Sequence, residues 1–184
     1  METLIRDAAP GDAGRLLEIY AHYVKNTAIT FECRVPSLPE FQDRVRNTLK
    51  RYPYLVIEQD GVIQGYAYAG ALSERAAYSW SCETSVYLDR AARKRGLGRA
   101  LYEALETRLR NMGILNLYAC VAFPETEDEY LSGNSAGFHA HMGFVKAGEF
   151  HQCGYKFNRW YNIIWMEKPI GRHRPDQPPV RFPS

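Results

Sequence analysis

Runs of apolar and polar positions along this chain predict alternating strands and helices. Short runs that are wholly apolar, or apolar at every second position, are typical of strands. Such runs occupy residues 3–6, 54–59, 62–68, 78–88, 115–122, 144–150 and 156–167. Apolar residues spaced three and four apart indicate amphipathic helices. These helices are expected over residues 16–24, 37–51, 97–112 and 135–142.

Local signals indicate where elements begin and turn. Asp60-Gly61 stands between two apolar runs, and this dipeptide favours the two-residue turn of a β-hairpin. Ser37 is placed to cap the next helix, and Glu40 follows three residues later to close a capping box. The helix over 97–112 connects two strands, so we expect them to form a parallel pair within a mixed α/β sheet.

The composition is that of an ordinary globular protein. The 184 residues are 46% hydrophobic and 24% charged, which suits one domain with its own core. A net charge of +2 argues against a dedicated nucleic-acid binder. No apolar run approaches the roughly 20 residues of a membrane span. We expect one domain over residues 1–168 and a Pro- and Arg-rich tail over 169–184, either mobile or a strap on a partner.

The cysteines and the N-terminus predict a cytoplasmic protein. The four cysteines include no Cys-x-x-Cys pair, which favours reduced thiols over a disulfide frame or a metal site. The first residues lack the cationic and then apolar stretch of a signal peptide. We therefore expect a cytoplasmic chain without a bound metal.

The run from Arg93 to Gly98, RKRGLG, is the strongest functional signal in the chain. Two glycines two positions apart let the backbone pass close to a ligand. A loop that opens a helix also directs free N–H groups and the positive end of the helix dipole at one point. With three basic side chains alongside, the run predicts an anionic, phosphorylated ligand. A basic helix start with incidental glycines is the alternative, which the flanking strand and helix disfavour.

Glu83 lies inside the strand that precedes this run, near Trp80, Cys82 and Val86. Partial burial raises the pKa of a carboxyl group towards that of a base working near neutral pH. Transfer of an acyl group to an amine needs such a base, because a protonated amine has no lone pair. A solvated glutamate on the outer face of the strand is the alternative, and the anion-binding run ten residues later favours the base.

The Arg-x-x-Gly-x-Gly run after a Val-rich strand resembles the acetyl-CoA pyrophosphate loop of the GNAT acetyltransferase superfamily. Other motifs are similar to the phosphinothricin N-acetyltransferase group, colinearly over roughly residues 3–168. These motifs are TAITFE at 27–32, RYPYLV at 51–56, YAYAG at 66–70, Arg75, and AYxWxxExSVY at 77–87. The resemblance implies a single GNAT-type domain with a mixed, mostly antiparallel sheet flanked by helices and a parallel strand pair splayed at the coenzyme site. It also implies acetyl-CoA as cosubstrate and a homodimer.

The resemblance assigns roles to the strand and the loop. It implies that Glu83 is the general base. Backbone groups of the strand would pair with the pantetheine arm, and an N–H group near Val86 would hold the oxyanion. Amides of the loop would hold the pyrophosphate. The implied coenzyme contacts are Val86, Tyr87, Leu88, Arg93, Lys94, Arg95, Gly96, Leu97, Gly98, Arg99 and Asn134.

On the acceptor side, the resemblance implies contacts from Phe31, Arg75 and Tyr78. The guanidinium of Arg75 suits a carboxylate or phosphinate, with a surface arginine as the alternative, and Phe31 would wall the acceptor pocket unless it only packs in the core. His139 matches a position that protonates the departing CoA thiolate. The alternative for His139 is a polar helix residue.

Two features depart from the pattern of the group. The usual Asn stands where this chain has Ser132, so the contact to pantetheine could come from Asn134, from a shifted register, or not be made. The connection over 124–133 is longer and more acidic than usual. It would disfavour acidic acceptors if it borders the acceptor site, and it is otherwise a solvated surface insertion.

These features predict an acetyl-CoA-dependent N-acetyltransferase that acts by direct transfer. The expected acceptor is the primary amine of a small amino acid or analogue, such as phosphinothricin, methionine sulfone or methionine sulfoximine. A protein or peptide acceptor is the alternative within enzymes. A non-catalytic acyl-CoA sensor or an RNA binder is the alternative of another class.

Overall fold

The computed structural model describes residues 2–183, which form two compact units. The first unit holds the N-terminal residues up to Ile19, then Pro36–Leu117, and the tail from Pro169. The second unit holds Tyr20–Val35 and Tyr118–Lys168. None of the helices in the described part of the chain is both long and apolar enough to cross a bilayer.

The sheet of the first unit contains four neighbouring antiparallel strands. They are β1 (Thr3–Asp7), β2 (Tyr54–Gln59), β3 (Val62–Ala71) and β4 (Ser81–Leu88), in that spatial order. Asp60 and Gly61 both have positive φ, 49° and 79°, as a tight hairpin turn between β2 and β3 requires. The predicted hairpin is therefore confirmed.

The strand predicted over 78–88 begins later than expected. Ala76–Tyr78 forms a 3-10 turn, and β4 begins only at Ser81. The turn is closed by hydrogen bonds from the N–H groups of Tyr78 and Ser79 to the carbonyls of Arg75 and Ala76. Tyr78 thus lies on the segment that leads into the strand.

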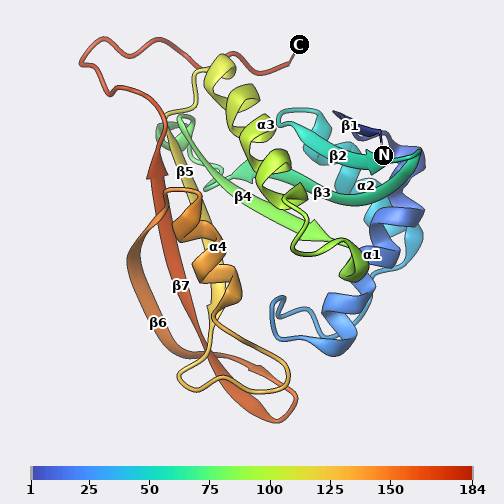
Figure 1. Ribbon diagram of the computed structural model, residues 1–184. Coiled ribbons are helices and arrows are strands. Elements are labelled where there is room, and N and C mark those ends of the chain that lie inside the picture. The colour runs from blue at the N-terminus through green and yellow to red at the C-terminus, as the bar shows by residue number, and fades with distance from the viewer. Residues whose placement is uncertain (1, 184) are drawn as a thin grey trace. The chain divides into compact units, whose positions relative to one another are not determined.

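Three helices flank these strands. They are α1 (Ala13–Asn26), which continues into the second unit, α2 (Leu38–Leu49) and α3 (Leu97–Met112). Ser37 caps α2, and its N–H group donates to Glu40 in return at 2.7 Å, as the capping box predicts. Figure 1 shows α3 lying along β3 and β4. Its apolar stripe, Leu101, Leu105 and Leu109, is fully buried.

A fifth strand, β5 (Asn116–Phe123), begins beside the start of β4. The N–H groups of Leu115 and Asn116 both donate to the carbonyl of Trp80, and the Asn116 side chain donates to Ser81 Oγ at 3.2 Å. The helix α3 therefore returns the chain to the same end of the sheet, as expected for a crossover between parallel strands. Gly113, with φ 92°, ends α3 just before this strand.

The second unit contains the strands β5, β7 and β6, in that order, and helix α4 (Asn134–His141). The strands β6 (Val145–Lys156) and β7 (Arg159–Pro169) form a long antiparallel hairpin. The prediction that a strand begins at Lys156 and runs through the next two residues was wrong. Phe157 and Asn158 both have positive φ, 53° and 58°, so they form the two-residue turn of this hairpin.

The C-terminal tail is hydrogen-bonded to other parts of the first unit, which differs from the expected mobile segment, and the alternative of a strap on a partner stays a prediction. The Trp80 indole donates to the carbonyl of Pro178 at 2.8 Å. The Arg181 N–H and side chain donate to the carbonyls of Met112 and Asn111, at 2.8 and 2.7 Å. Figure 1 shows the tail passing the end of α3, where these carbonyls lack helical partners.

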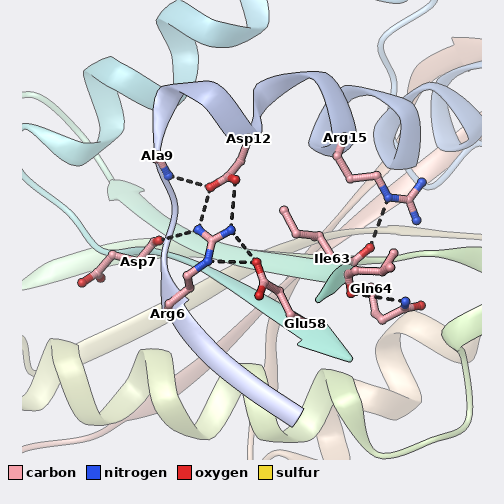
Figure 2. Close-up of polar contacts among 9 residues, drawn as sticks. Arg6, Asp7, Ala9, Asp12, Arg15, Glu58, Ile63 and Gln64 are labelled. Carbon is pink, nitrogen blue, oxygen red and sulfur yellow. Dashed lines mark hydrogen bonds and ion pairs between the residues drawn. The ribbon is translucent and has the colours of Figure 1, made fainter. Parts of the chain in front are cut away.

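A polar cluster joins β1 to its neighbours at the start of the chain. The guanidinium of Arg6 donates to both carboxylate oxygens of Asp12 and to Glu58 on β2 (Figure 2). The side-chain hydrogen bond to Arg6 lowers the pKa of Asp12. This cluster links β1 to β2 through Glu58 and to the turn before α1 through Asp12.

Candidate active site

Glu83 lies in the middle of β4, on the side opposite to α3. Its neighbours Cys82 and Thr84 are buried, and the hydroxyl of Thr84 is hydrogen-bonded to Tyr102 of α3. Because strand side chains alternate between faces, Glu83 points to the other face. Across the strand pair it faces Gly70 of β3, which has no side chain to cover it.

The environment of Glu83 favours its protonated form. The residue is half-buried, and burial raises the pKa of its carboxyl group. The neighbouring Cys82 thiol, fully buried on the opposite face, has its pKa raised to about 12 by burial and by the charge of Glu83. The thiol therefore stays protonated near neutral pH, whereas the raised pKa of Glu83 makes its carboxylate a stronger base than that of an exposed glutamate.

The face of the sheet that carries Glu83 is lined with tyrosine rings. Tyr66 and Tyr87 are opposite each other on β3 and β4, with ring centroids 5.5 Å apart. Tyr68 is opposite Tyr54 on β2, and their rings stack at 4.8 Å. The face of the strands that carries Glu83 therefore presents aromatic rings and their hydroxyl groups.

The RKRGLG run forms the loop between β4 and α3. The loop is anchored at its start by Asp89, whose side chain accepts from Ala91 N–H and from Arg15 at 2.6 Å. Lys94 and Gly96 both have positive φ, 61° and 77°. Arg95 separates these two left-handed residues, and α3 begins directly after Gly96.

The predicted coenzyme residues divide by exposure. Arg93, Lys94, Arg95, Gly96 and Arg99 are exposed, whereas Leu97 and Gly98 are buried in the first turn of α3. The loop thus presents cationic side chains and backbone N–H groups to solvent together with the N-terminus of a 16-residue helix. That combination binds phosphate groups.

The strand residues predicted to pair with pantetheine are half-buried. Val86 is opposite Ala67 and Leu88 is opposite Gly65 in the ladder with β3. A Cβ on Gly65 would lie 2.4 Å from Leu88 Cδ2, so the two strands approach closely here. Tyr87, between them, lies on the face that carries Glu83.

Arg75 and Tyr78 lie in the 3-10 turn just before β4, in the same unit as Glu83. Arg75 is exposed, and Tyr78 is 42% exposed. The turn is held by the Ser79 hydroxyl, which donates to Ala76 O at 2.7 Å. Both side chains are therefore available to a ligand on this segment.

In the second unit, Phe31 lies on a tightly held stretch of chain. The buried Lys156 donates from Nζ to the carbonyl of Thr30 at 2.8 Å. Tyr20 OH is hydrogen-bonded to Thr30 Oγ1 at 2.8 Å and to Glu32 at 2.5 Å. The backbone on both sides of Phe31 is thus fixed by side chains from α1 and β6.

His139 is buried in α4. Its Nδ1–H group donates to the carbonyl of Ser135 at 2.8 Å, and its ring makes edge contacts with Phe138 and Phe144. Burial lowers the pKa of His139. A neutral ring with its proton on Nδ1 offers Nε2 as an acceptor, not as a donor. Asn134, by contrast, is the exposed first residue of α4.

The acidic connection over 124–133 is held by one arginine. Arg159 pairs with Asp128 at 2.9 Å and, through both terminal nitrogens, with Glu129 at 2.7 and 2.9 Å. Tyr161 OH also donates to Asp128. The hydrogen bond from Arg159 lowers the pKa of Glu129. Arg159 therefore offsets one of the four negative charges that Glu125, Glu127, Asp128 and Glu129 bring to this segment.

The sequence pattern of one known family, described as "Acetyltransferase (GNAT) domain", matches residues 5–165. The chain belongs to the GNAT acetyltransferase family. The match includes β4, the loop, α3 and α4, so the family pattern covers every residue placed above.

Relatives and solved structures agree with this assignment. The chain is 36% identical to the phosphinothricin N-acetyltransferase of Alcaligenes faecalis, over 90% of this chain and 82% of that one. It is 31% identical to the L-methionine sulfoximine/L-methionine sulfone acetyltransferase of Salmonella typhimurium, over 92% and 95%. The crystal structure of a GNAT superfamily phosphinothricin acetyltransferase from Sinorhizobium meliloti, in complex with AcCoA, superposes with a TM-score of 0.84 at 32% identity, over 93% and 90% of the two chains.

Within this GNAT chain, Glu83, the strand residues, the loop, Arg75 and Tyr78 all lie in the first unit, on the continuous segment 75–99, with Arg75 and Tyr78 before β4 and the loop after it. Phe31, Asn134 and His139 belong to the second unit. Among the described residues, no group of three or more His, Cys, Asp or Glu side chains could hold a metal ion.

Sequence reasoning missed the residues that hold the second unit of this GNAT chain. Lys156 was included in a predicted strand, and nothing marked it as the partner of Thr30. Arg159 follows the hairpin turn, and its pairing with Asp128 and Glu129 depends on that turn. A lysine inside an aromatic strand was the available signal, since buried lysines occur with a partner.

Proposed function

We propose that this chain transfers an acetyl group from acetyl-CoA to the primary amine of a small amino acid or amino-acid analogue. The observation that carries the proposal is the half-buried Glu83, whose pKa is raised, on the strand that leads directly into an anion-binding loop. Acetyl transfer needs a base to deprotonate the amine and a loop to bind the phosphate groups of CoA. Here the candidate base and the candidate loop lie on the same strand and the segment directly after it.

Glu83 acts as the general base. An amino acid reaches the site as an ammonium ion, and the carboxylate of Glu83 removes one proton, directly or through a water molecule. The raised pKa makes Glu83 a stronger base than an exposed glutamate. The neutral amine then attacks the thioester carbonyl. The buried Cys82 thiol is protonated and faces the other way, so transfer proceeds without a cysteine-bound intermediate.

The loop and the strand hold the coenzyme. N–H groups from Lys94 to Arg99 bind the pyrophosphate at the N-terminus of α3, and the exposed basic side chains attract its charge. Backbone groups of Val86 and Leu88 pair with the pantetheine arm. An N–H group near Val86 stabilises the oxyanion of the tetrahedral intermediate.

His139 has a lesser role than the base. Its lowered pKa makes the protonated ring a minor species at neutral pH, and its single proton is engaged with Ser135. The thiolate of CoA can instead take its proton from water or from the attacking amine. We therefore expect replacement of His139 to lower the rate much less than replacement of Glu83.

The acceptor side favours a compact, acidic amino acid. Arg75 and Tyr78 lie exposed beside the start of β4, and a guanidinium binds a carboxylate or phosphinate well. Arg159 offsets part of the negative charge of the acidic connection by pairing with Asp128 and Glu129. The relatives named for phosphinothricin and for methionine sulfone support this class.

Release of CoA from acetyl-CoA, measured across a panel of amines, tests this function. The panel contains the free amino acids, methionine sulfone, methionine sulfoximine, phosphinothricin and a few peptides. Turnover with a free amino acid or analogue is expected. Turnover with peptides alone would favour a protein acceptor, and tight acetyl-CoA binding without release on any amine would favour a sensor.

The protein forms a homodimer in this proposal. Large aromatic side chains of the β6–β7 hairpin are exposed, with Phe150 at 57%, Tyr155 at 53% and Trp160 at 59%. Aromatic surface of this kind is typical of protein interfaces. Sedimentation should give a dimer for the native chain and a monomer for Trp160→Glu. A native monomer at micromolar concentration would contradict this part of the proposal.

A further inference from the structure

The carboxylate of Asp89 caps the start of the proposed coenzyme loop. Its Oδ1 accepts from the Ala91 N–H group at 2.8 Å, and Asp89 precedes the run from Arg93 to Gly98 by four residues. The backbone N–H group of Asp89 donates to the carbonyl of Gln64 on β3 at 2.7 Å. A negative charge is thus fixed at the start of a loop that the proposed function assigns to an anionic coenzyme, and like charges repel.

Arg15 of α1 pairs with this carboxylate. Its Nη2 donates to Asp89 Oδ2 at 2.6 Å. Its Nε donates to the carbonyl of Ile63 at 3.1 Å (Figure 2), and its Nη1 donates to the exposed Glu18 on the same helix at 3.1 Å. Three acceptors in different directions hold the planar guanidinium in one orientation.

Both members of this ion pair are held by neighbouring residues of β3. Ile63 accepts from Arg15, and Gln64 accepts from the backbone of Asp89. Ile63 is buried, and only 33% of the Arg15 side chain and 24% of the Asp89 side chain are exposed. Surface ion pairs contribute little, because long exposed side chains lose rotamer freedom and solvent screens their charges. This pair is fixed and partly buried, so its loss should have a measurable effect.

We propose that Arg15 raises the affinity for the pyrophosphate of acetyl-CoA by offsetting the charge of Asp89. This inference rests on the proposed function, in which N–H groups of the loop after Asp89 hold the pyrophosphate. Asp89 supplies the cap at the start of the loop, and Arg15 offsets the repulsion that the cap would otherwise exert on the coenzyme. Arg15 is then a positioning residue, because it acts through Asp89 without touching the coenzyme.

The test measures the Kd for CoA by titration calorimetry on the intact chain. Arg15→Met should raise the Kd about 3- to 10-fold, because it takes one positive charge from beside Asp89. Asp89→Asn removes the negative charge and keeps an acceptor for the Ala91 N–H group, so its Kd should stay near that of the wild type. Arg15→Met combined with Asp89→Asn should recover most of the lost affinity. The control Arg46→Met, which removes an arginine from an ion pair on α2, should bind as the wild type does.

The salt dependence of the Kd separates an effect of charge from an effect on folding. Because salt screens charges, the difference in Kd between Arg15→Met and the wild type should shrink from about 0.05 M to about 0.5 M NaCl. An unchanged Kd in Arg15→Met, or a double variant that binds no better than Arg15→Met, would overturn the inference alone. A wild-type chain that does not bind CoA would overturn the proposed function, and this inference with it.

Discussion

At the scale of single residues, the roles proposed for Cys82 and Glu83 rest on their positions on opposite faces of one strand. Cys82 and Glu83 are adjacent in sequence, yet the same effect of burial has opposite consequences for a thiol and for a carboxylate. The pKa of both groups is raised. A raised pKa keeps a thiol protonated and unreactive, whereas it makes a carboxylate a better base near neutral pH. In the proposed mechanism, the alternation of side chains along β4 thus separates the base, Glu83, from the inert thiol of Cys82.

Arg75→Ala tests the acceptor side at this scale. Loss of a charge-assisted bidentate contact costs roughly 1.5–3 kcal/mol, so kcat/KM for amino acids with an acidic group should fall about 10- to 100-fold. Peptide acceptors and the KM for acetyl-CoA should change little. Arg46→Ala, on the surface of α2, is the control. Equal losses for amino acids and peptides would exclude Arg75 as the acceptor's anion site.

At the scale of elements, the loop between β4 and α3 depends on left-handed backbone positions. Gly96 has φ 77°, and a Cβ at this position would meet no atom within 4 Å, so only conformation, and not space, requires glycine there. Lys94 adopts φ 61° without being glycine, which stores some strain at the site. In the proposed binding mode, backbone N–H groups of this loop hold the pyrophosphate.

Gly96→Ala should therefore weaken coenzyme binding specifically. Left-handed backbone costs a non-glycine residue roughly 1–2 kcal/mol, so the loop relaxes and the KM for acetyl-CoA should rise about 5- to 30-fold. The matched control is Gly61→Ala in the β2–β3 turn, which has φ 79° and the same open space. It should lower stability by a similar amount and leave the KM unchanged. Equal kinetics in both variants would refute the loop assignment.

Local signals in the sequence predicted most of these elements. They did not predict the contacts between residues that are far apart in sequence. The capping box at Ser37 and the turn at Asp60-Gly61 each depend on residues within four positions of one another, so the sequence alone can predict them. The turn at Phe157-Asn158 looks like a strand because an aromatic residue occupies it. Its support comes from Tyr130, whose ring stacks on Phe157 at 4.1 Å, and no local pattern reports such a contact.

The candidate site divides in the same way. Glu83 and the loop lie within one strand and one helix start, so pattern and resemblance were enough to name them. The ring of Phe31 packs against Gly154, and Lys156 donates a hydrogen bond to the carbonyl of Thr30. Both contacts join segments that are far apart in sequence. Those contacts follow from the packing of α1, β6 and β7, which the apolar pattern alone does not specify.

At the scale of the whole molecule, the C-terminal tail is part of the first unit. It covers the last carbonyls of α3 and places Phe182 beside Tyr52, while the Arg51 guanidinium lies 4.4 Å from the Phe182 ring. The polar, Pro-rich tail thus donates hydrogen bonds to the last carbonyl groups of α3. We expect it to contribute to stability, since its hydrogen bonds join it to Trp80 and to the end of α3.

Truncation after Asp176 should lower stability without abolishing activity. It removes the contacts of Pro178, Arg181 and Phe182, worth roughly 1–2 kcal/mol together, and the Tm should fall by about 2–8 °C. Thermal unfolding and the amine panel measure both effects. Trp80→Phe, which removes only the hydrogen bond to Pro178, should give a smaller decrease. An unchanged Tm would show that the tail does not hold to the first unit in solution.

The pH dependence of Glu83→Gln tests the central claim most directly. In the wild-type enzyme, kcat/KM should fall as the pH decreases through the raised pKa of Glu83, because the protonated carboxyl group cannot accept a proton. In Glu83→Gln, kcat should be lower by about 10²- to 10⁴-fold, and this acidic limb should disappear while acetyl-CoA still binds. A variant that keeps a near-normal kcat at every pH would contradict the assignment of Glu83 as the base.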